Sequence, residues 1–180
     1  MREIERLDLD RIATPVGTML VVSDARGRVR AIDWSDYETR MLRLLRLHYG
    51  DRGAQLRDAR APAELRAQLE RYFAGELRAL DAIVTATGGT TFQREVWSAL
   101  RAIPAGRTVS YRELATRLGR PRAIRAVGLA NGANPIGVVV PCHRVVGANR
   151  SLTGYGGGLA RKRWLLAHEG VRFDADRVAC

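Results

Sequence analysis

The chain has 180 residues, of which 46% are hydrophobic and 27% are charged, as expected for a folded globular protein. Its apolar runs fall short of the roughly 18 residues that span a membrane, and its charged first residues lack the apolar stretch of a signal peptide. We therefore expect a cytoplasmic protein without a membrane partner. Nearly all of the net charge of +11 arises in residues 91–180, which hold 15 basic and 5 acidic residues, against 15 basic and 14 acidic residues in residues 1–90. This asymmetry favours a polyanionic partner for the second half.

The first half predicts a domain of strands and helices. Strands are expected at residues 11–14 and 18–22 around a Pro15-Val16-Gly17 turn, and then at 29–34 and 81–84. Apolar residues recur on one helical face in residues 37–48 and again from Pro62 to Gly75. This half contains no cysteine, so a Cys/His zinc site is not expected there. A Gly/Thr-rich segment marks the boundary, which gives two domains, residues 1–86 and 87–180.

The second half predicts a helix-turn-helix. After a helix at residues 92–102, Ser110 and Glu113 form a capping box that opens a helix from residue 111 to 118. Gly119 ends that helix, and Pro121 begins another that runs to about residue 131 and carries Arg122 and Arg125. A close-packed helical hairpin without a nucleic-acid partner is the alternative. Residues 136–140 form an apolar run that predicts a buried strand, and residues 159–169 predict a further helix.

Cys142 directly follows the predicted strand and is flanked by His143 and Arg144. Cationic neighbours lower the pKa of a thiol and favour the nucleophilic thiolate. Side chains of adjacent residues point to opposite sides of an extended backbone, so a water is expected between Cys142 and His143. Glu169 is the candidate acceptor that orients His143. The alternative is an inert buried cysteine. The other cysteine, Cys180, ends the chain, so a disulfide framework is not expected.

The segment Val140-Pro141-Cys142-His143-Arg144-Val145-Val146 resembles the active-site motif of the O6-alkylguanine-DNA alkyltransferases. Further segments fit the family in order and spacing: Phe92-Gln93-Arg94-Glu95-Val96-Trp97, Ile103-Pro104-Ala105-Gly106 leading to Ser110-Tyr111, Arg125-Ala126-Val127-Gly128, Asn134-Pro135, Gly154-Tyr155 and His168-Glu169-Gly170. The first half is similar to the family more weakly, through residues 14–17 and 72–75. The resemblance implies an α+β fold, with an N-terminal ribonuclease H-like α/β domain followed by a C-terminal winged helix-turn-helix-like DNA-binding domain.

The resemblance also implies an activity. An alkyl group on O6 of guanine, and also on O4 of thymine, would pass irreversibly to Cys142 from duplex DNA, once per protein molecule. The protein would bind the minor groove and flip the nucleotide out of the helix. The family uses no cofactor, and we expect no metal. The expected partner is double-stranded DNA carrying O6-alkylguanine, bound by a monomer, with cooperative binding along DNA left open.

The resemblance assigns roles to individual residues. Cys142 would accept the alkyl group, His143 would take its proton through a water, and Glu169 would hold His143. Asn134 would brace the cysteine turn. Tyr111 would donate a proton to the leaving guanine and press on the phosphate, and Arg125 would fill the gap in the base stack. Further DNA contacts would come from Arg112, Arg120, Ala126 and Gly128, and the guanine pocket would be lined by Val145, Val146, Tyr155 and Gly156.

Three features depart from the family pattern. Ile124 replaces a frequent alanine before Arg125, and Asn149-Arg150-Ser151 lacks the glycine usual in that loop. Gly156 is smaller than the serine of some members, which suggests room for bulkier alkyl groups. Two other function classes remain open: a non-catalytic DNA-binding protein, either a lesion sensor or a helix-turn-helix regulator, and a cysteine hydrolase. The regulator leaves Cys142, His143 and Glu169 unexplained, and the hydrolase would turn over repeatedly.

Overall fold

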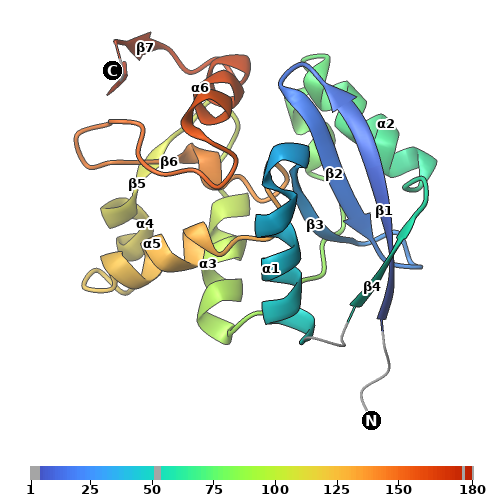
Figure 1. Cartoon of the computed structure of the whole chain (residues 1–180). Coiled ribbons are helices and arrows are strands. Elements are labelled where there is room, and N and C mark those ends of the chain that lie inside the picture. The colour runs from blue at the N-terminus through green and yellow to red at the C-terminus, as the bar shows by residue number, and fades with distance from the viewer. Residues whose placement is uncertain (1–4, 51–53, 176, 180) are drawn as a thin grey trace. The chain divides into compact units, whose positions relative to one another are not determined.

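A computed structural model describes residues 5–50, 54–175 and 177–179, and the chain divides into two compact units, residues 1–89 and 90–180 (Figure 1). Cys180 lies outside the described residues. Within the described part of the chain, none of the helices combines the length and apolar character needed to cross a membrane.

The first unit is built on a four-stranded sheet with the order β3-β2-β1-β4. The first three strands form an antiparallel meander, whereas β4 pairs with β1 in parallel. The strands are β1 Glu5–Thr14, β2 Gly17–Ser23, β3 Val29–Trp34 and β4 Ala54–Asp58. β2 and β3 confirm the sequence prediction, as does the turn before Gly17, whereas β1 contains the predicted residues 11–14 but begins at Glu5. β4 was not predicted, since its five residues include no β-branched or aromatic side chain.

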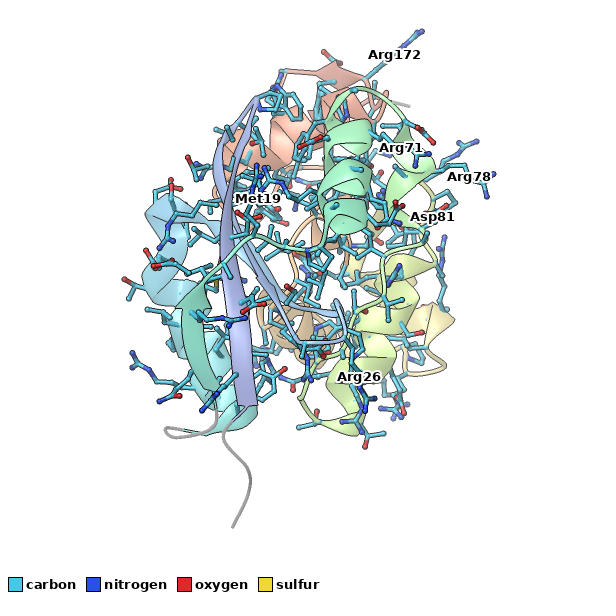
Figure 2. All side chains as sticks on the ribbon, turned by 90° about the vertical axis from the view of Figure 1, so that its right-hand side faces the viewer. Met19, Arg26, Arg71, Arg78, Asp81 and Arg172 are labelled. Atoms are coloured by element: carbon cyan, nitrogen blue, oxygen red, sulfur yellow. The ribbon has the colours of Figure 1, made fainter. Side chains whose placement is uncertain are left out.

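Two helices, α1 Glu38–Tyr49 and α2 Ala63–Phe73, cover opposite faces of this sheet. Figure 2 shows the sheet nearly edge-on between them, with Arg78 extending away from the ribbon. α1 packs Met41 and Leu45 on the core face of β1, which carries Leu7 and Leu9. Asp10 points to the other face of the pleat. There its carboxylate accepts the Ala61 N–H at 2.9 Å, just before α2. Two short 3-10 helices complete the unit, η1 Ser35–Tyr37 and η2 Leu77–Leu80.

The strand predicted at residues 81–84 is wrong. η2 ends there in successive turns, in which the N–H groups of Asp81 and Ile83 donate to Arg78 and Leu80. Those donors are therefore not available to a sheet. Only Thr85 forms an isolated bridge, to Val29. Ile83 is nevertheless buried.

The second unit is mainly helical, and its short strands pair two by two. Its elements are α3 Thr91–Arg101, β5 Val109–Ser110, α4 Tyr111–Arg117, α5 Ile124–Gly132, η3 Cys142–Arg144, β6 Val145–Val146, α6 Leu159–His168, β7 Phe173–Asp174 and β8 Arg177–Val178. The predicted helices at residues 92–102, 111–118 and 159–169 are confirmed. The predicted start at Pro121 is wrong: the Ala123 N–H closes a turn onto Arg120, and α5 begins at Ile124.

The predicted strand at residues 136–140 is also wrong, although the burial it implied is present. Ile136 and Val138 are fully buried, yet the segment is a series of turns, in which the Val140 N–H donates to the Ile136 carbonyl at 3.1 Å. An apolar run predicts burial without fixing the backbone conformation. Here the N–H groups of Val139 and Val140 donate to carbonyls of Gly137 and Ile136 within the turn.

Candidate functional site

The turn before Cys142 is held by the side chain of Asn134, which is buried. Its Nδ2 donates to the carbonyls of Val140 at 2.8 Å and Ile136 at 3.3 Å, and its Oδ1 accepts the Ile136 N–H at 3.0 Å. Val138 adopts φ 68 within the turn, a left-handed conformation that is costly for a β-branched residue. Asn134 thus fixes a strained turn immediately before the cysteine.

Cys142 opens the 3-10 helix η3 and is buried. The extended backbone expected for Cys142 and His143 is therefore wrong. The reason is local: the Arg144 N–H turns back to the Pro141 carbonyl, and the Val145 N–H to the Cys142 carbonyl. A 3-10 helix has about three residues per turn, so adjacent side chains still point in different directions.

His143, Arg144 and Glu169 form a buried network. His143 Nε2 lies 2.9 Å from Glu169 Oε1, while Arg144 donates from Nε to Oε2 at 2.8 Å and from Nη2 to Oε1 at 2.9 Å. Burial alone would raise the pKa of Glu169, but His143 and Arg144 hold that pKa far below its usual value. Burial lowers the pKa of His143, although Glu169 opposes the shift. At neutral pH the network therefore holds a neutral imidazole whose Nε2–H donates to a carboxylate.

The second ring nitrogen of His143 has a different environment. His143 Nδ1 is buried, and within the described residues no protein atom forms a hydrogen bond with it. The ring of Tyr155 lies edge-on to the imidazole, with centroids 6.4 Å apart. The two sides of the imidazole are thus distinct: Glu169 fixes one nitrogen, and the other has no hydrogen-bond partner among the described residues.

Tyr111 is placed near the cysteine by the capping box that sequence analysis predicted. The Ser110 Oγ accepts the Glu113 N–H at 3.1 Å, and the Glu113 carboxylate accepts the Ser110 N–H at 2.6 Å. Burial raises the pKa of the Tyr111 phenol, hydrogen bonds with Thr153 and Asn131 lower it, and a negative charge on Cys142 raises it. The Tyr111 phenol therefore lies close enough to Cys142 for its pKa to depend on the charge of the thiol.

The helix pair α4 and α5 presents arginines at its surface. Arg112 and Arg125 are exposed, as is Ala126. A Cβ added to Gly128 would lie 3.9 Å from the Tyr111 ring, in ordinary van der Waals contact. Arg120 is also exposed, but it forms an ion pair of 2.8 Å with Glu95. Leu129, at 77% exposure, is a large apolar side chain on the outer face of α5 that sequence analysis did not single out.

Only some of the residues expected to line the guanine pocket lie together in the structure. A hollow of about 700 Å³ beside β5 and β6 includes Val146 in its lining but neither Cys142 nor Tyr155. Val145 is buried and its carbonyl accepts a hydrogen bond from Lys162, and Gly156 is half-buried. Sequence reasoning also missed Lys162. Its one visible signal was being the only lysine among 30 basic residues.

The loop at residues 149–151 closes on itself. Arg150 adopts φ 63, the left-handed conformation that a glycine would take more easily. Asn149 Oδ1 accepts the Ser151 hydroxyl at 2.6 Å, and the Gly147 N–H donates to the Ser151 carbonyl at 2.9 Å. These bonds maintain the turn without the glycine that the family usually has there.

Comparison with known proteins identifies the class. Residues 91–171 match the model of the 6-O-methylguanine DNA methyltransferase DNA-binding domain, which places the chain among DNA-binding proteins. Residues 11–86 match the ribonuclease-like domain of the same family. The chain therefore belongs to the 6-O-methylguanine DNA methyltransferase family, and its function is DNA repair by alkyl transfer.

Known relatives are similar in sequence to this protein over most of the chain. The methylated-DNA–protein-cysteine methyltransferase of Salmonella typhimurium is 57% identical over 92% of this chain and 96% of its own length. That of Shigella flexneri is 53% identical over the same shares. A crystal structure of the Mycobacterium tuberculosis protein OGT in complex with DNA is 38% identical, with a TM-score of 0.73, over 90% of this chain and 92% of that one. The resemblance to the alkyltransferase family and the fold class that we predicted from the sequence are confirmed.

Proposed function

We propose that this protein removes the alkyl group from O6-alkylguanine, and from O4-alkylthymine, in duplex DNA by transferring it to Cys142, irreversibly and once per molecule. The observation that carries the proposal is the buried His143–Glu169 bond beside Cys142, with His143 Nδ1 free of partners within the described residues. This is the arrangement that a nucleophile, a base and an orienting group require.

The proton of Cys142 passes through a water to His143 Nδ1, which the lowered pKa of His143 keeps neutral and able to accept it. Glu169 then stabilises the imidazolium that forms. The thiolate sulfur attacks the alkyl carbon, the carbon–oxygen bond breaks, and its electron pair goes to the guanine. Tyr111 donates a proton to the departing base. The thioether product has no hydrolytic route back, so each molecule acts once.

DNA must present the nucleotide to a buried cysteine, so the base leaves the helix at a cost of about a few kcal/mol. α5 lies in the minor groove, where the small side chains at Ala126 and Gly128 permit close approach. Arg125, exposed on the same helix, fills the space left in the base stack. Arg112 and Arg120 contact phosphates, and Tyr155 and the β6 backbone hold the guanine.

A titration with excess substrate tests this proposal. Duplex DNA containing one O6-methylguanine is added in increasing excess, and the O6-methylguanine that has been lost is counted after enzymatic digestion. Repair should stop at one guanine per protein molecule. The Cys142→Ser variant should bind the duplex and repair none, whereas Cys180→Ser should match the original protein. Repeated turnover, or repair by Cys142→Ser, would contradict the proposal.

A further inference from the structure

Asn131 is a buried polar side chain on α5, only 6% exposed. Its backbone position is fixed from two sides. The Trp97 indole donates to the carbonyl of Ala130, the preceding residue, at 2.9 Å, and the Asn134 N–H donates to the Asn131 carbonyl at 3.3 Å. The turn of α5 that carries Asn131 is therefore tied to the segment that leads to the cysteine turn.

The Asn131 side chain lies beside Tyr111. Gly128 is on the same face of α5 one turn earlier, and a Cβ added there would lie 3.9 Å from the Tyr111 ring. The Tyr111 phenol forms a hydrogen bond with the Asn131 side chain. Among the described residues, none forms a hydrogen bond with Asn131 Oδ1, so the bond to Tyr111 comes from Nδ2. Because an amide nitrogen only donates, the phenol oxygen is the acceptor.

This direction of the bond leaves the phenol proton available. The Tyr111 phenol has a second partner, the side chain of Thr153. Burial raises the pKa of Tyr111, whereas the hydrogen bonds with Thr153 and Asn131 lower it. A hydrogen bond that lowers the pKa of a phenol favours its anionic form and is donated to its oxygen. Neither neighbour therefore uses the Tyr111 O–H.

The protein bears a cost for this arrangement. Asn131 Oδ1 is buried without a hydrogen bond among the described residues, and an unsatisfied buried acceptor destabilises a fold. A leucine of similar volume would leave no polar atom unpaired, but it would remove the bond that Tyr111 accepts. An amide turned the other way would accept the phenol proton and withdraw it from the site. The orientation that keeps this proton available is the one that leaves Oδ1 unsatisfied.

We propose that Asn131 is a positioning residue for Tyr111: its Nδ2 donates to the phenol oxygen and so directs the Tyr111 O–H towards the substrate base. This rests on the proposed function in one respect, that Tyr111 donates a proton to the departing base. Asn131 acts on the reaction only through Tyr111.

The same bond assists the proton transfer. When the carbon–oxygen bond of O6-alkylguanine breaks, its electron pair stays on the base. The Tyr111 O–H bond then breaks, its proton goes to the base, and its electron pair stays on the phenol oxygen. A donor already aimed at that oxygen stabilises the phenolate that forms and offsets the effect of burial.

A titration of Tyr111 tests the bond without DNA. The five tyrosines are replaced by 3-fluorotyrosine, whose phenol is more acidic, and fluorine NMR follows the signal that is missing from Tyr111→Phe. In Asn131→Leu the midpoint should move to higher pH by about one unit, because the phenolate loses a donor. Asn149→Leu, the same change at an exposed asparagine, should leave the midpoint unmoved. An unchanged midpoint in Asn131→Leu would show that Asn131 only fills space, and a lower one that the phenol donates to Oδ1; either would overturn the proposal.

If Asn131→Leu does not fold, the unaltered side chain decides the question. Protein labelled with nitrogen-15 in asparagine gives side-chain amide signals from Asn131, Asn134 and Asn149. Tyr111→Phe removes the acceptor, so an Asn131 amide proton should move upfield while the signals of the other two asparagines stay in place. An Asn131 signal that does not move would overturn the proposal.

Single-turnover methyl transfer from duplex DNA shows whether the bond serves the reaction. Asn131→Leu should slow transfer by about tenfold, the change that corresponds to one pH unit, with the affinity for the duplex unchanged. In a Tyr111→Phe background the same substitution should have no further effect, and additive losses would overturn the proposal. If Tyr111→Phe transfers as fast as the original protein, the role of Tyr111 in the proposed function fails, whereas the two NMR measurements still report the Asn131 bond.

Discussion

Replacing Glu169 with glutamine should strongly destabilise the second unit. The Glu169 carboxylate is fully buried and receives one bond from His143 and two from Arg144, at 2.8–2.9 Å. Glutamine keeps the size but removes the charge, and its amide hydrogens face groups that are themselves donors. Breaking a buried ion pair by removing one partner costs about 3–5 kcal/mol, because the other charge stays buried.

Glu95→Gln is the matched control. Glu95 pairs with Arg120 at 2.8 Å, but both side chains are 41–46% exposed. Exposed ion pairs contribute only about 0–1 kcal/mol. The two substitutions make the same chemical change, so the expected difference between them reflects burial.

Hydrogen exchange resolved by peptide gives the opening free energy of the second unit separately from the first. Glu169→Gln should lower it by about 3–5 kcal/mol at neutral pH. The depressed pKa of Glu169 contributes stability that is present above its ordinary value of 4.5 and is lost as the pH falls through the lower folded-state value. The difference in opening free energy between the original protein and Glu169→Gln should therefore become smaller at acidic pH. Equal, small losses in Glu169→Gln and Glu95→Gln would refute this reasoning.

Four further predictions follow from the site. Asn134→Ala should lower the opening free energy of the second unit by at least about 2 kcal/mol, measured by the same exchange experiment, because buried backbone groups lose their partners. Arg125→Ala should slow transfer from duplex DNA but not from free O6-benzylguanine, which needs no flipping; Arg78→Ala, an exposed charge in the first unit, is its control. Gly156→Ser should reduce the rate for benzyl adducts more than for methyl adducts in single-turnover assays. The buried, neutral His143 contributes stability that is present above pH 6.5 and is lost as the pH falls, so His143→Gln should flatten the pH dependence of stability on the acid side of that value.

Each of these predictions has a contradictory result. An Asn134→Ala variant as stable as the original would show that the cysteine turn does not depend on the amide. If Arg125→Ala slowed transfer from duplex DNA and from free O6-benzylguanine equally, the substitution would affect the chemical step rather than nucleotide flipping. An unchanged benzyl-to-methyl ratio in Gly156→Ser would remove that residue from the substrate pocket. An unchanged pH slope in His143→Gln would mean that the histidine is not held neutral.

Local sequence signals predicted the helices well, because helix caps involve residues three positions apart. Ser110 and Glu113 form the capping box that the sequence indicates, and Gly119 ends α4 at a positive φ of 68. β4 was missed because its partner strand, β1, lies far away along the chain. The sequence of a short, mostly polar segment does not by itself predict that the segment pairs with a distant strand.

At the site, the residue types were predictable but the geometry was not. The apolar residues 136–140 indicate burial, yet the Asn134 amide supplies partners that the sequence alone attributes to a neighbouring strand. That Cys142 and His143 are adjacent in the sequence does not predict that both lie in the 3-10 helix η3. Lys162 was overlooked because its burial depends on carbonyls contributed by β6 and by residues 153–154, which only the folded chain brings together.

Intact-mass measurement after mixing the protein with duplex DNA carrying one O6-methylguanine tests the central claim most directly. The account predicts a gain of one methylene unit, located by peptide mapping on Cys142 and absent from Cys142→Ser. A methyl group found on Cys180 instead, or no gain in mass while the duplex remains bound, would contradict it.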